Sequence, residues 1–141
     1  MIKLMTETVE TTARNQLIDI TQRVQKLVTA RRFIDGLACV YVPHTTAAVT
    51  IQENADPDTQ HDLLRKLESL VPQMESYYQH DEGNSDAHVK ASLVGCSVMI
   101  PVESARLVLG RWQSIYFCEF DGPRERRLHV KLIGSDAGQG D

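Results

Sequence analysis

Apolar and polar residues alternate along several short stretches of the chain, which is the spacing of half-buried β-strands. We expect strands at 2–12, 17–20, 37–42, 46–52, 96–102, 112–120 and 126–133. Asp121, Gly122 and Pro123 separate the last two stretches, and this composition is typical of a turn. The pattern therefore predicts that the last two strands form a β-hairpin.

Helical spacing occurs in three other segments, expected at about 21–32, 57–71 and 86–94. Apolar residues recur every three or four positions after Thr21, whose hydroxyl suits an N-cap. Asp56 and Pro57 form a helix-start signal, and the stripe of leucines that follows stops at Pro72. The polar stretch before the third helix predicts a long loop, a type of segment that often carries function.

The expected strands outnumber the helices and do not alternate with them regularly. This order favours an α+β fold with mostly antiparallel, β-sandwich-like sheets and two or three packed helices over a doubly wound parallel sheet. The chain has no internal repeat or linker, so we expect one domain at 1–134 and a flexible C-terminal tail at 135–141. In 112–120 both alternating sets are apolar, which predicts that a second layer or a partner subunit covers the strand.

The composition of the 141-residue chain is ordinary for a globular protein, with 42% hydrophobic residues, 24% charged residues and a net charge of -4. An acidic balance does not favour nonspecific binding to nucleic acid. No apolar run approaches the roughly 20 residues of a membrane helix, and the first residues lack the apolar core of a secretory signal. We therefore expect a cytoplasmic protein with no membrane or nucleic-acid partner.

Three cysteines, Cys39, Cys96 and Cys118, each lie in an apolar, strand-like run. Their number is odd and their spacing is unpaired, which argues against a disulfide framework and against a CxxC zinc site. We expect all three to be buried thiols.

Two polar segments, 44–54 and 80–88, carry the candidate chemistry. Between them they hold three histidines with nearby carboxylates and amides, a ligand set that zinc or a similar divalent ion accepts. His80 and His88 would be roughly 12 Å apart along one continuous helix, so they can meet only if the chain bends between them. A Gly-Asn-Ser sequence at 83–85 supplies that bend, and its Asn or Ser could cap the next helix. The alternative is that these are surface histidines on a loop.

Two charged residues share the buried side of their expected strands, Glu53 and Arg126. A buried carboxylate must be paired, bind a cation or have a raised pKa, whereas a strand end open to water needs none of these. Arg126, with Arg124 and Arg127, could bind phosphate or carboxylate oxygens through its guanidinium. The alternative is a solvated hairpin end with surface salt bridges.

Signatures of several enzyme classes are missing from the sequence. It has no GxxxxGK[ST] phosphate loop, no GxGxxG after a strand, no GxSxG elbow and no HExxH. His61 is expected at the surface, and His129 is expected on the opposite side of its strand from the buried residues. The remaining candidates are the two polar segments and the arginines near 126.

Taken together, HTTAAVTIQENADPD, YQHDEGNSDAHVKASLVG and LGRWQSIYFCEFDGPRERR resemble the YjbQ family, also called the secondary thiamine-phosphate synthase family. The similarity runs from about Thr21 to Gly134 in the same order and with similar spacing. It implies an α+β sandwich-like fold assembled as a homotrimer. It also implies a weak, secondary ability to join a hydroxymethylpyrimidine diphosphate to a thiazole phosphate.

The resemblance further implies roles for individual residues. The implied metal ligands, for a divalent ion such as zinc or magnesium, are His44, His80 and His88. The implied catalytic residues are Glu53, Asn84, Arg124 and Arg126. The implied contacts to a phosphorylated small molecule are Thr45, Thr46, Asn54 and Gln113, and the pattern also includes Trp112 and Asp121. Arg111 departs from the pattern, which has a small residue, often Thr, before the Trp-Gln pair.

Two other functions stay open on the sequence. One is a non-enzymatic trimer that binds a metal or an anionic metabolite. The other is a metal-dependent phosphate-ester hydrolase, because three histidines and a carboxylate can also activate water.

Overall fold

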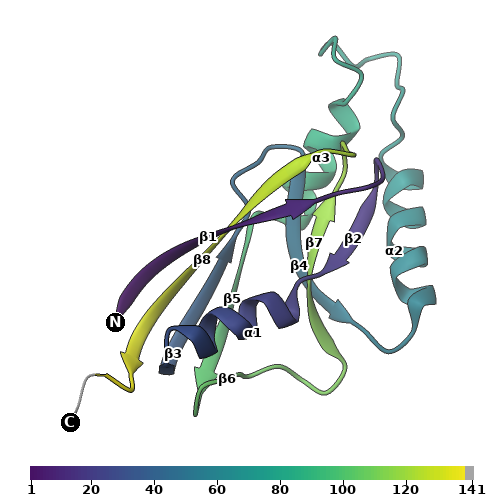
Figure 1. The fold of residues 1–141 in the computed structure, drawn as a ribbon. Coiled ribbons are helices and arrows are strands. Elements are labelled where there is room, and N and C mark those ends of the chain that lie inside the picture. The colour runs from purple at the N-terminus through teal and green to yellow at the C-terminus, as the bar shows by residue number, and fades with distance from the viewer. Residues whose placement is uncertain (139–141) are drawn as a thin grey trace.

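The computed structural model describes residues 1–138, and residues 139–141 lie outside the described part. The elements in chain order are β1 (Ile2–Glu10), β2 (Gln16–Asp19), α1 (Thr21–Ala30), β3 (Phe33–Tyr41), β4 (Ala47–Glu53), α2 (Pro57–Leu70), α3 (Ser85–Val94), β5 (Ser97–Glu103), β6 (Arg106–Leu107), β7 (Gln113–Glu119) and β8 (Glu125–Asp136). Figure 1 shows α1 across the lower part of the strands, α2 at the right-hand margin and α3 near the upper end of the strands.

The strands form two antiparallel sheets, one of five strands in the order β1-β8-β3-β5-β6 and one of three in the order β2-β7-β4. Together with the three helices they make an α+β fold, as the sequence predicts. Strands are brought together from distant parts of the chain, because β1 and β3 both pair with the last strand, β8.

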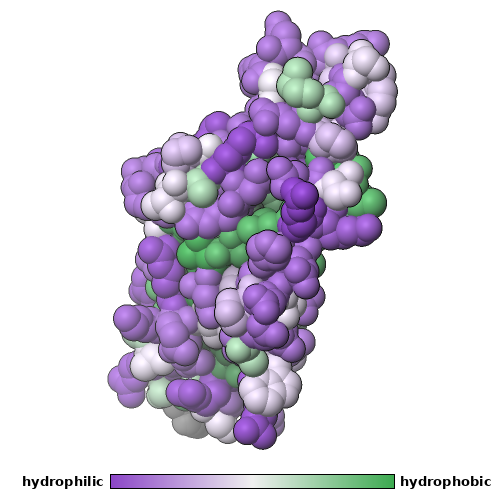
Figure 2. All heavy atoms as spheres, turned by 90° about the vertical axis from the view of Figure 1, so that its right-hand side faces the viewer, coloured by the Kyte–Doolittle hydropathy of each residue, from purple (hydrophilic) through white to green (hydrophobic). Residues whose placement is uncertain are grey.

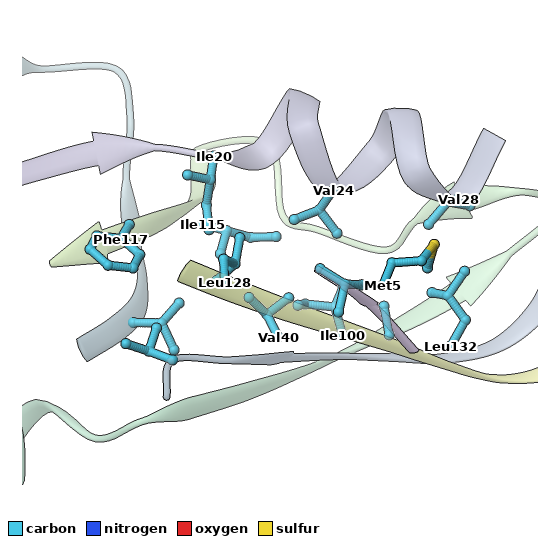
Figure 3. Close-up of a cluster of buried hydrophobic side chains, with 14 of the residues drawn as sticks. Met5, Ile20, Val24, Val28, Val40, Ile100, Ile115, Phe117, Leu128 and Leu132 are labelled. Carbon is cyan, nitrogen blue, oxygen red and sulfur yellow. The ribbon is translucent and has the colours of Figure 1, made fainter. Parts of the chain in front are cut away.

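The main core lies between the inner face of the five-stranded sheet, α1 and one face of the three-stranded sheet. Figure 3 shows Val24 and Val28 of α1 pointing toward Met5, Val40 and Leu132 of the large sheet. A smaller cluster lies on the other face of the three-stranded sheet, where α3 and the leucines of α2 pack. The molecule therefore has three layers, with the three-stranded sheet in the middle.

Strand β7 is buried on both faces. Ile115 and Phe117 belong to the main core, whereas Cys118 contributes to the smaller cluster beneath α3. The doubly apolar pattern of this strand is thus explained by a second layer within the same subunit, and it no longer requires a partner subunit.

The predicted hairpin between the last two strands is wrong. β7 pairs with β2 and β4, and β8 pairs with β1 and β3, so the two strands belong to different sheets. Each is a central strand with both edges already paired. The turn near Gly122 therefore carries the chain from one sheet to the other instead of folding it back on itself.

The helix starts agree only in part with the predictions. Asp56 caps α2, because its Oδ1 accepts a hydrogen bond from the N–H of Asp58 at 2.9 Å. Thr21 does not cap α1, whose N-cap is Ile20. The Thr21 hydroxyl oxygen instead accepts a bond from the N–H of Ile115 at 2.8 Å, which fastens the start of α1 to β7.

The three cysteines are free thiols with different exposure. Cys118 is buried as predicted, Cys39 is half-buried and Cys96 is exposed. The prediction is wrong for Cys96 because this residue lies in the turn between α3 and β5, outside the apolar strand.

Strand β8 runs to Asp136, two residues into the expected tail, and residues 139–141 of that tail lie outside the described part. Within residues 1–138, no helix combines the length and apolar character needed to cross a membrane.

The two large faces of the molecule differ in polarity. The face that carries α2 is mostly hydrophilic, with apolar residues visible along a hollow across its middle (Figure 2). In the described part of the chain, residues 1–138, no helix covers the outer face of the five-stranded sheet, where Ile2, Ile133 and Leu37 are exposed and pair across β1, β8 and β3. Leu4, Met99 and Tyr41 extend this area, which also contains the exposed Lys131 and is called the outer face below.

Candidate functional site

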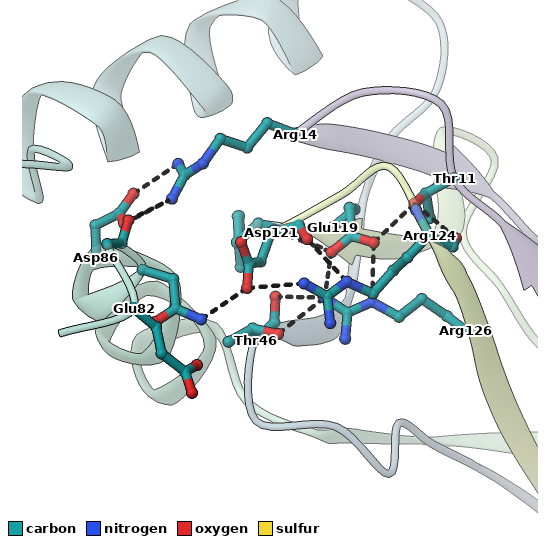
Figure 4. A network of polar contacts seen from close by, with 12 residues as sticks. Thr11, Arg14, Thr46, Glu82, Asp86, Glu119, Asp121, Arg124 and Arg126 are labelled. Carbon is teal, nitrogen blue, oxygen red and sulfur yellow. Dashed lines mark hydrogen bonds and ion pairs between the residues drawn. The ribbon is translucent and has the colours of Figure 1, made fainter. Parts of the chain in front are cut away.

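A buried ion pair between Arg126 and Glu119 forms the centre of the candidate site (Figure 4). Arg126 is 3% exposed and Glu119 is fully buried. Arg126 Nε donates to Glu119 Oε1 at 2.8 Å, and its Nη2 contacts Glu119 Oε2. The same Nη2 donates to the hydroxyl of Thr46 at 2.9 Å and to its carbonyl oxygen at 3.2 Å. The guanidinium is therefore held from two sides, and it is buried as the strand alternation predicts.

Glu119 is a residue that the sequence analysis missed. Besides Arg126, it accepts hydrogen bonds from the hydroxyl of Thr11 at 2.8 Å and from the N–H groups of Phe120 and Asp121 at 3.0 Å each. Burial alone would raise the pKa of its carboxyl, but the bonds from Arg126, Asp121 and Thr11 outweigh burial and the pKa is lowered. A carboxylate inside a strand that is apolar on both faces needs a cationic partner, and this signal was present in the sequence.

Both arginines of the site leave one guanidinium nitrogen free. Arg124 donates from Nε to the carbonyl oxygen of Asp121 at 2.9 Å and from Nη2 to its carboxylate at 3.1 Å. Within residues 1–138, no acceptor contacts Nη1 of Arg124 or Nη1 of Arg126. A cavity of about 590 Å³ lies against both side chains, and it is bordered on the other side by His44, Thr45 and Cys96. We call it the arginine cavity.

His44 borders the arginine cavity from the connection between β3 and β4. Its Nε2 accepts a hydrogen bond from the N–H of Arg127 at 2.9 Å. Burial, and after it the charge of Arg126, lower the pKa of the imidazole. The neutral ring therefore carries its proton on Nδ1, which can act as a hydrogen-bond donor.

A second cavity of about 380 Å³ adjoins the first and is called the α3 cavity. Its wall consists of His44, Thr45, Ala47, His88, Ala91, Ser92, Gly95 and Cys96. The ring of His80 lies edge-on to that of His88, with 5.3 Å between the ring centroids. The predicted bend between these two histidines is confirmed: Gly83 has a φ of 72°, in the left-handed region that suits glycine, and α3 begins at Ser85.

The three histidines approach one another, but one subunit does not present them as a metal site. Within residues 1–138, no three His, Cys, Asp or Glu side chains are grouped so that they could hold an ion. Nε2 of His44 is already occupied by the Arg127 amide, and its Nδ1 carries the proton. The single subunit therefore does not fit the zinc or magnesium ion that the resemblance implies, because the lone pairs do not converge.

Asn84 links the start of α3 to Asp121. Its Nδ2 donates to Asp121 Oδ2 at 2.8 Å, and Asp121 in turn accepts from Arg124. Asn84 occupies the N-cap position of α3, but its side chain makes no capping bond, so the predicted capping by Asn84 is wrong. Its Oδ1 is buried and has no partner among the described residues. Because the carboxylate fixes the donor end of the amide, Oδ1 needs a donor from water or a ligand.

Asp86 anchors α3 through a second buried charge cluster that the sequence analysis also missed. Arg14 donates to its two oxygens at 2.9 and 3.0 Å, and Lys90 donates to Oδ2 at 3.1 Å. Burial alone would raise the pKa of Asp86, but the bonds from Arg14 and Lys90 lower it. The spacing of Asp86 and Lys90, four residues apart on a helix, was the available sequence signal. The cluster holds the helix that carries His88.

The other predicted site residues, Glu53, Asn54, Gln113 and Trp112, lie at the opposite end of the three-stranded sheet. Glu53 pairs with Gln113 in the β4–β7 register, whereas Ala47 pairs with Glu119. The six-residue separation along β4 corresponds to roughly 20 Å. Within one subunit, these four residues therefore do not reach the arginine cavity.

Each residue of this distant group has a local partner. Glu53 is half-buried, and its Oε2 accepts from the hydroxyl of Thr59 at 2.7 Å. Asn54 donates to the hydroxyl of Ser114 at 2.8 Å, and Gln113 accepts from the N–H of Gly110 at 2.7 Å. The Trp112 ring is exposed, and the Arg111 guanidinium lies over it at 4.8 Å.

The comparison with known proteins agrees with this fold over almost the whole chain. A family model described as "UPF0047 protein YjbQ-like" matches residues 5–135. The chain is 47% identical to the UPF0047 protein YugU of Bacillus subtilis, over 93% of this chain and 99% of that protein. It is 48% identical to a UPF0047 protein of Methanocaldococcus jannaschii, over 89% of this chain and 91% of that protein.

Solved structures show the same similarity. A crystal structure of an uncharacterized YjbQ/UPF0047 protein from Clostridium acetobutylicum matches with a TM-score of 0.89 and 50% identity, covering 92% of this chain and 99% of that chain. A YbjQ-like protein of unknown function from Sulfolobus solfataricus matches with a TM-score of 0.90 and 30% identity, covering 96% of this chain and 99% of that chain. The chain therefore belongs to the YjbQ/UPF0047 family.

Proposed function

We propose that this protein binds a phosphorylated small molecule in the arginine cavity. The observation that carries the proposal is the orientation of Arg126, whose guanidinium is locked by Glu119 and Thr46 while its side chain borders the cavity and its Nη1 has no acceptor among residues 1–138. Phosphate oxygens accept hydrogen bonds from such a fixed, planar donor. Nη1 of Arg124 and Nδ1 of His44 add two further donors at the same cavity.

The proposed binding does not depend on a large positive charge. Glu119 and Asp121 balance much of the charge of Arg126 and Arg124. The cavity instead offers donors that are already oriented, and a ligand oxygen replaces the water that would otherwise satisfy them. This arrangement favours a phosphate or diphosphate group over a nonspecific polyanion such as nucleic acid.

For the reaction, we propose the transfer that the family resemblance suggests. The nitrogen of a thiazole phosphate would bond to the methylene carbon of a hydroxymethylpyrimidine diphosphate, while the bond between that carbon and the diphosphate oxygen breaks. Diphosphate leaves with the bonding electron pair, and the product is thiamine phosphate. The free Nη1 donors of Arg124 and Arg126 support this assignment because they could stabilise charge on the leaving group. Phosphorylated intermediates of this kind are consistent with a cytoplasmic protein.

We also propose that the protein is a homotrimer whose subunits contact through the outer face. Exposed Ile2, Leu37 and Ile133 support a partner there, because apolar areas of this kind on a sheet mark interaction sites. Tyr41 belongs to the outer face and also borders the arginine cavity, so a second copy on this face would lie beside the cavity. Glu53 and Gln113 can reach an arginine cavity only from such a neighbouring subunit.

Binding is tested by titrating inorganic diphosphate into the purified protein and its Arg124→Gln variant in a calorimeter. Removing a charged donor should weaken diphosphate binding about tenfold or more. Arg127→Gln is the matched control, since it removes the same charge from a side chain that does not border the cavity. Equal affinities for the wild type and Arg124→Gln, or no binding of diphosphate at millimolar concentration, would refute the proposal.

The reaction is tested separately, by measuring thiamine phosphate formed from the two phosphorylated precursors with and without added zinc or magnesium. Product should exceed that of a variant with alanine at His44, His80 and His88. If diphosphate binds but no product forms, the protein is a binding protein for anionic metabolites. Release of phosphate from simple phosphate esters would instead support the metal-dependent hydrolase. If no phosphate is released from those esters, the hydrolase is contradicted.

A further inference from the structure

We infer that the arginine cavity and the α3 cavity form one continuous binding trough, which selects phosphorylated molecules that carry a compact, uncharged organic group. The phosphate lies at the arginine end and the organic group lies against α3. This inference rests on the proposed binding of a phosphorylated ligand and adds the identity of its second half.

The continuity of the trough follows from three shared residues. His44, Thr45 and Cys96 border both cavities. The arginine cavity of about 590 Å³ and the α3 cavity of about 380 Å³ therefore meet along these three residues, and a ligand that lies across them can occupy both. Ligand sites commonly measure about 300 to 1,000 Å³, so each half is large enough for part of a small metabolite.

The two ends of the trough have different chemistry. The arginine end is bordered by Arg124 and Arg126, each with a free Nη1. Among the described residues, the wall of the α3 end includes no Lys, Arg, Asp or Glu. Among residues 1–138, an anionic group meets cationic donors only at the first end, and so the difference in charge fixes the direction of the ligand.

Small side chains shape the α3 end. Ala47, Ala91 and Gly95 contribute only small groups to the wall, which also includes His88 and Ser92. The Ser92 hydroxyl already donates to the carbonyl oxygen of His88 at 2.9 Å, so it offers an acceptor rather than a second donor. A flat ring or a short aliphatic group with few polar atoms fits this lining, whereas a second phosphate does not.

His44 borders both cavities, and this position suits it to donate a hydrogen bond to the middle of the ligand. Its neutral ring presents Nδ1–H at the junction, because Nε2 is bonded to the Arg127 amide. A donor at this point suits the bridging oxygen or an unesterified oxygen of the phosphate. His44 would thus sit over the atom that joins the anionic group to the organic group.

Ser92 provides a substitution that fills only the α3 end. It is exposed, so Ser92→Phe places a ring in the α3 cavity without disturbing the core. The neighbouring Leu93 is 63% exposed and borders neither cavity, which makes Leu93→Phe the matched control. Circular dichroism establishes that both variants are folded before binding is compared.

The experiment measures the Kd values of methylphosphonate and phenylphosphonate, which share one anionic group and differ in the organic group. The wild type and Leu93→Phe should bind phenylphosphonate about tenfold more tightly or better, because burying the ring removes apolar surface from water. Ser92→Phe should abolish this preference and leave methylphosphonate binding unchanged.

Two results would contradict the inference that one ligand occupies both cavities. One is equal affinity of the wild type for both phosphonates, and the other is a Ser92→Phe variant that keeps the preference or weakens both ligands equally. In either case phosphonate still binds. The proposed binding of a phosphorylated ligand is then supported, and the inference of a continuous trough is refuted. If neither phosphonate nor inorganic phosphate binds to the wild type, the proposed function fails and the trough fails with it.

Discussion

Arg126 and Glu119 join the two sheets through the interior of the molecule, since Arg126 lies on β8 and Glu119 is the last residue of β7. Removing two charges from water costs more than a buried pair usually recovers, so stability alone is a weak reason for such a pair. The pair has a clearer geometric effect, because it fixes the plane of the guanidinium whose Nη1 remains free beside the arginine cavity. The ion pair therefore has the effect of orienting the group that we propose to bind the ligand.

The first prediction separates this orienting effect from stability. Glu119→Gln leaves Arg126 buried without its counter-charge, and it should lower the free energy of unfolding by about 3–5 kcal/mol. Replacing both residues, as Glu119→Leu with Arg126→Met, should recover most of that loss because no unpaired charge remains. Urea unfolding gives the stabilities, and calorimetry gives diphosphate binding. The double variant should be folded and unable to bind diphosphate, and tight diphosphate binding by it would contradict the assigned role of Arg126.

A second prediction concerns acid unfolding. Hydrogen bonds hold the pKa of Glu119 below 4.5 and that of Asp86 below 3.8 in the folded protein. Both carboxyls bind protons more weakly when folded, so their contribution to stability is complete above about pH 5 and is lost as the pH falls through their folded-state pKa values. Urea midpoints measured from pH 7 to pH 3 should be steady and then fall. The fall should be smaller in Glu119→Leu with Arg126→Met, and an unchanged midpoint down to pH 3 would contradict the prediction.

Much of the fold could be predicted from the chain because alternation along a strand is a local property. The spacing in 126–133 placed Arg126 on the buried side, and it is 3% exposed. Sheet membership is not local, and so a composition typical of a turn near Gly122 led to a hairpin that does not exist. Only the three-dimensional packing shows that β7 and β8 are each central strands of different sheets.

The candidate site could be predicted only in part. His44 and Glu53 belong to the same polar segment, 44–54, but they lie at opposite ends of β4, and strand geometry alone separates such positions by roughly 20 Å or more. Conversely, His80 and His88 meet because the chain bends at Gly83, which sequence composition does reveal. Glu119 is hard to recognise from the sequence because it lies inside a run that is otherwise apolar, although an acid at such a position requires a cationic partner.

A third prediction uses Cys96, which borders both cavities and is exposed. Iodoacetamide should label Cys96 rapidly, and saturating diphosphate should slow the reaction severalfold because the ligand covers the shared wall. Cys118 should stay unlabelled, since burial raises the pKa of its thiol to about 12 and excludes the reagent. Peptide mass spectrometry assigns the labelled residue, and Cys96→Ser is the control. Labelling of Cys96 at the same rate with and without diphosphate would show that the ligand does not lie there.

The last prediction concerns assembly through the outer face. Ile133 lies on β8 between Ile2 of β1 and Leu37 of β3, and all three side chains are exposed in the single subunit. Ile133→Glu should therefore convert a trimer into monomers, because a carboxylate between Ile2 and Leu37 would lose its hydration when a second subunit covers it. Light scattering at micromolar concentration measures the mass of each species. Leu93→Glu makes a similar apolar-to-acid change at an exposed position on α3 and should leave the trimer intact. A monomeric wild type, or a trimer that survives Ile133→Glu, would show that the subunits do not meet through this face.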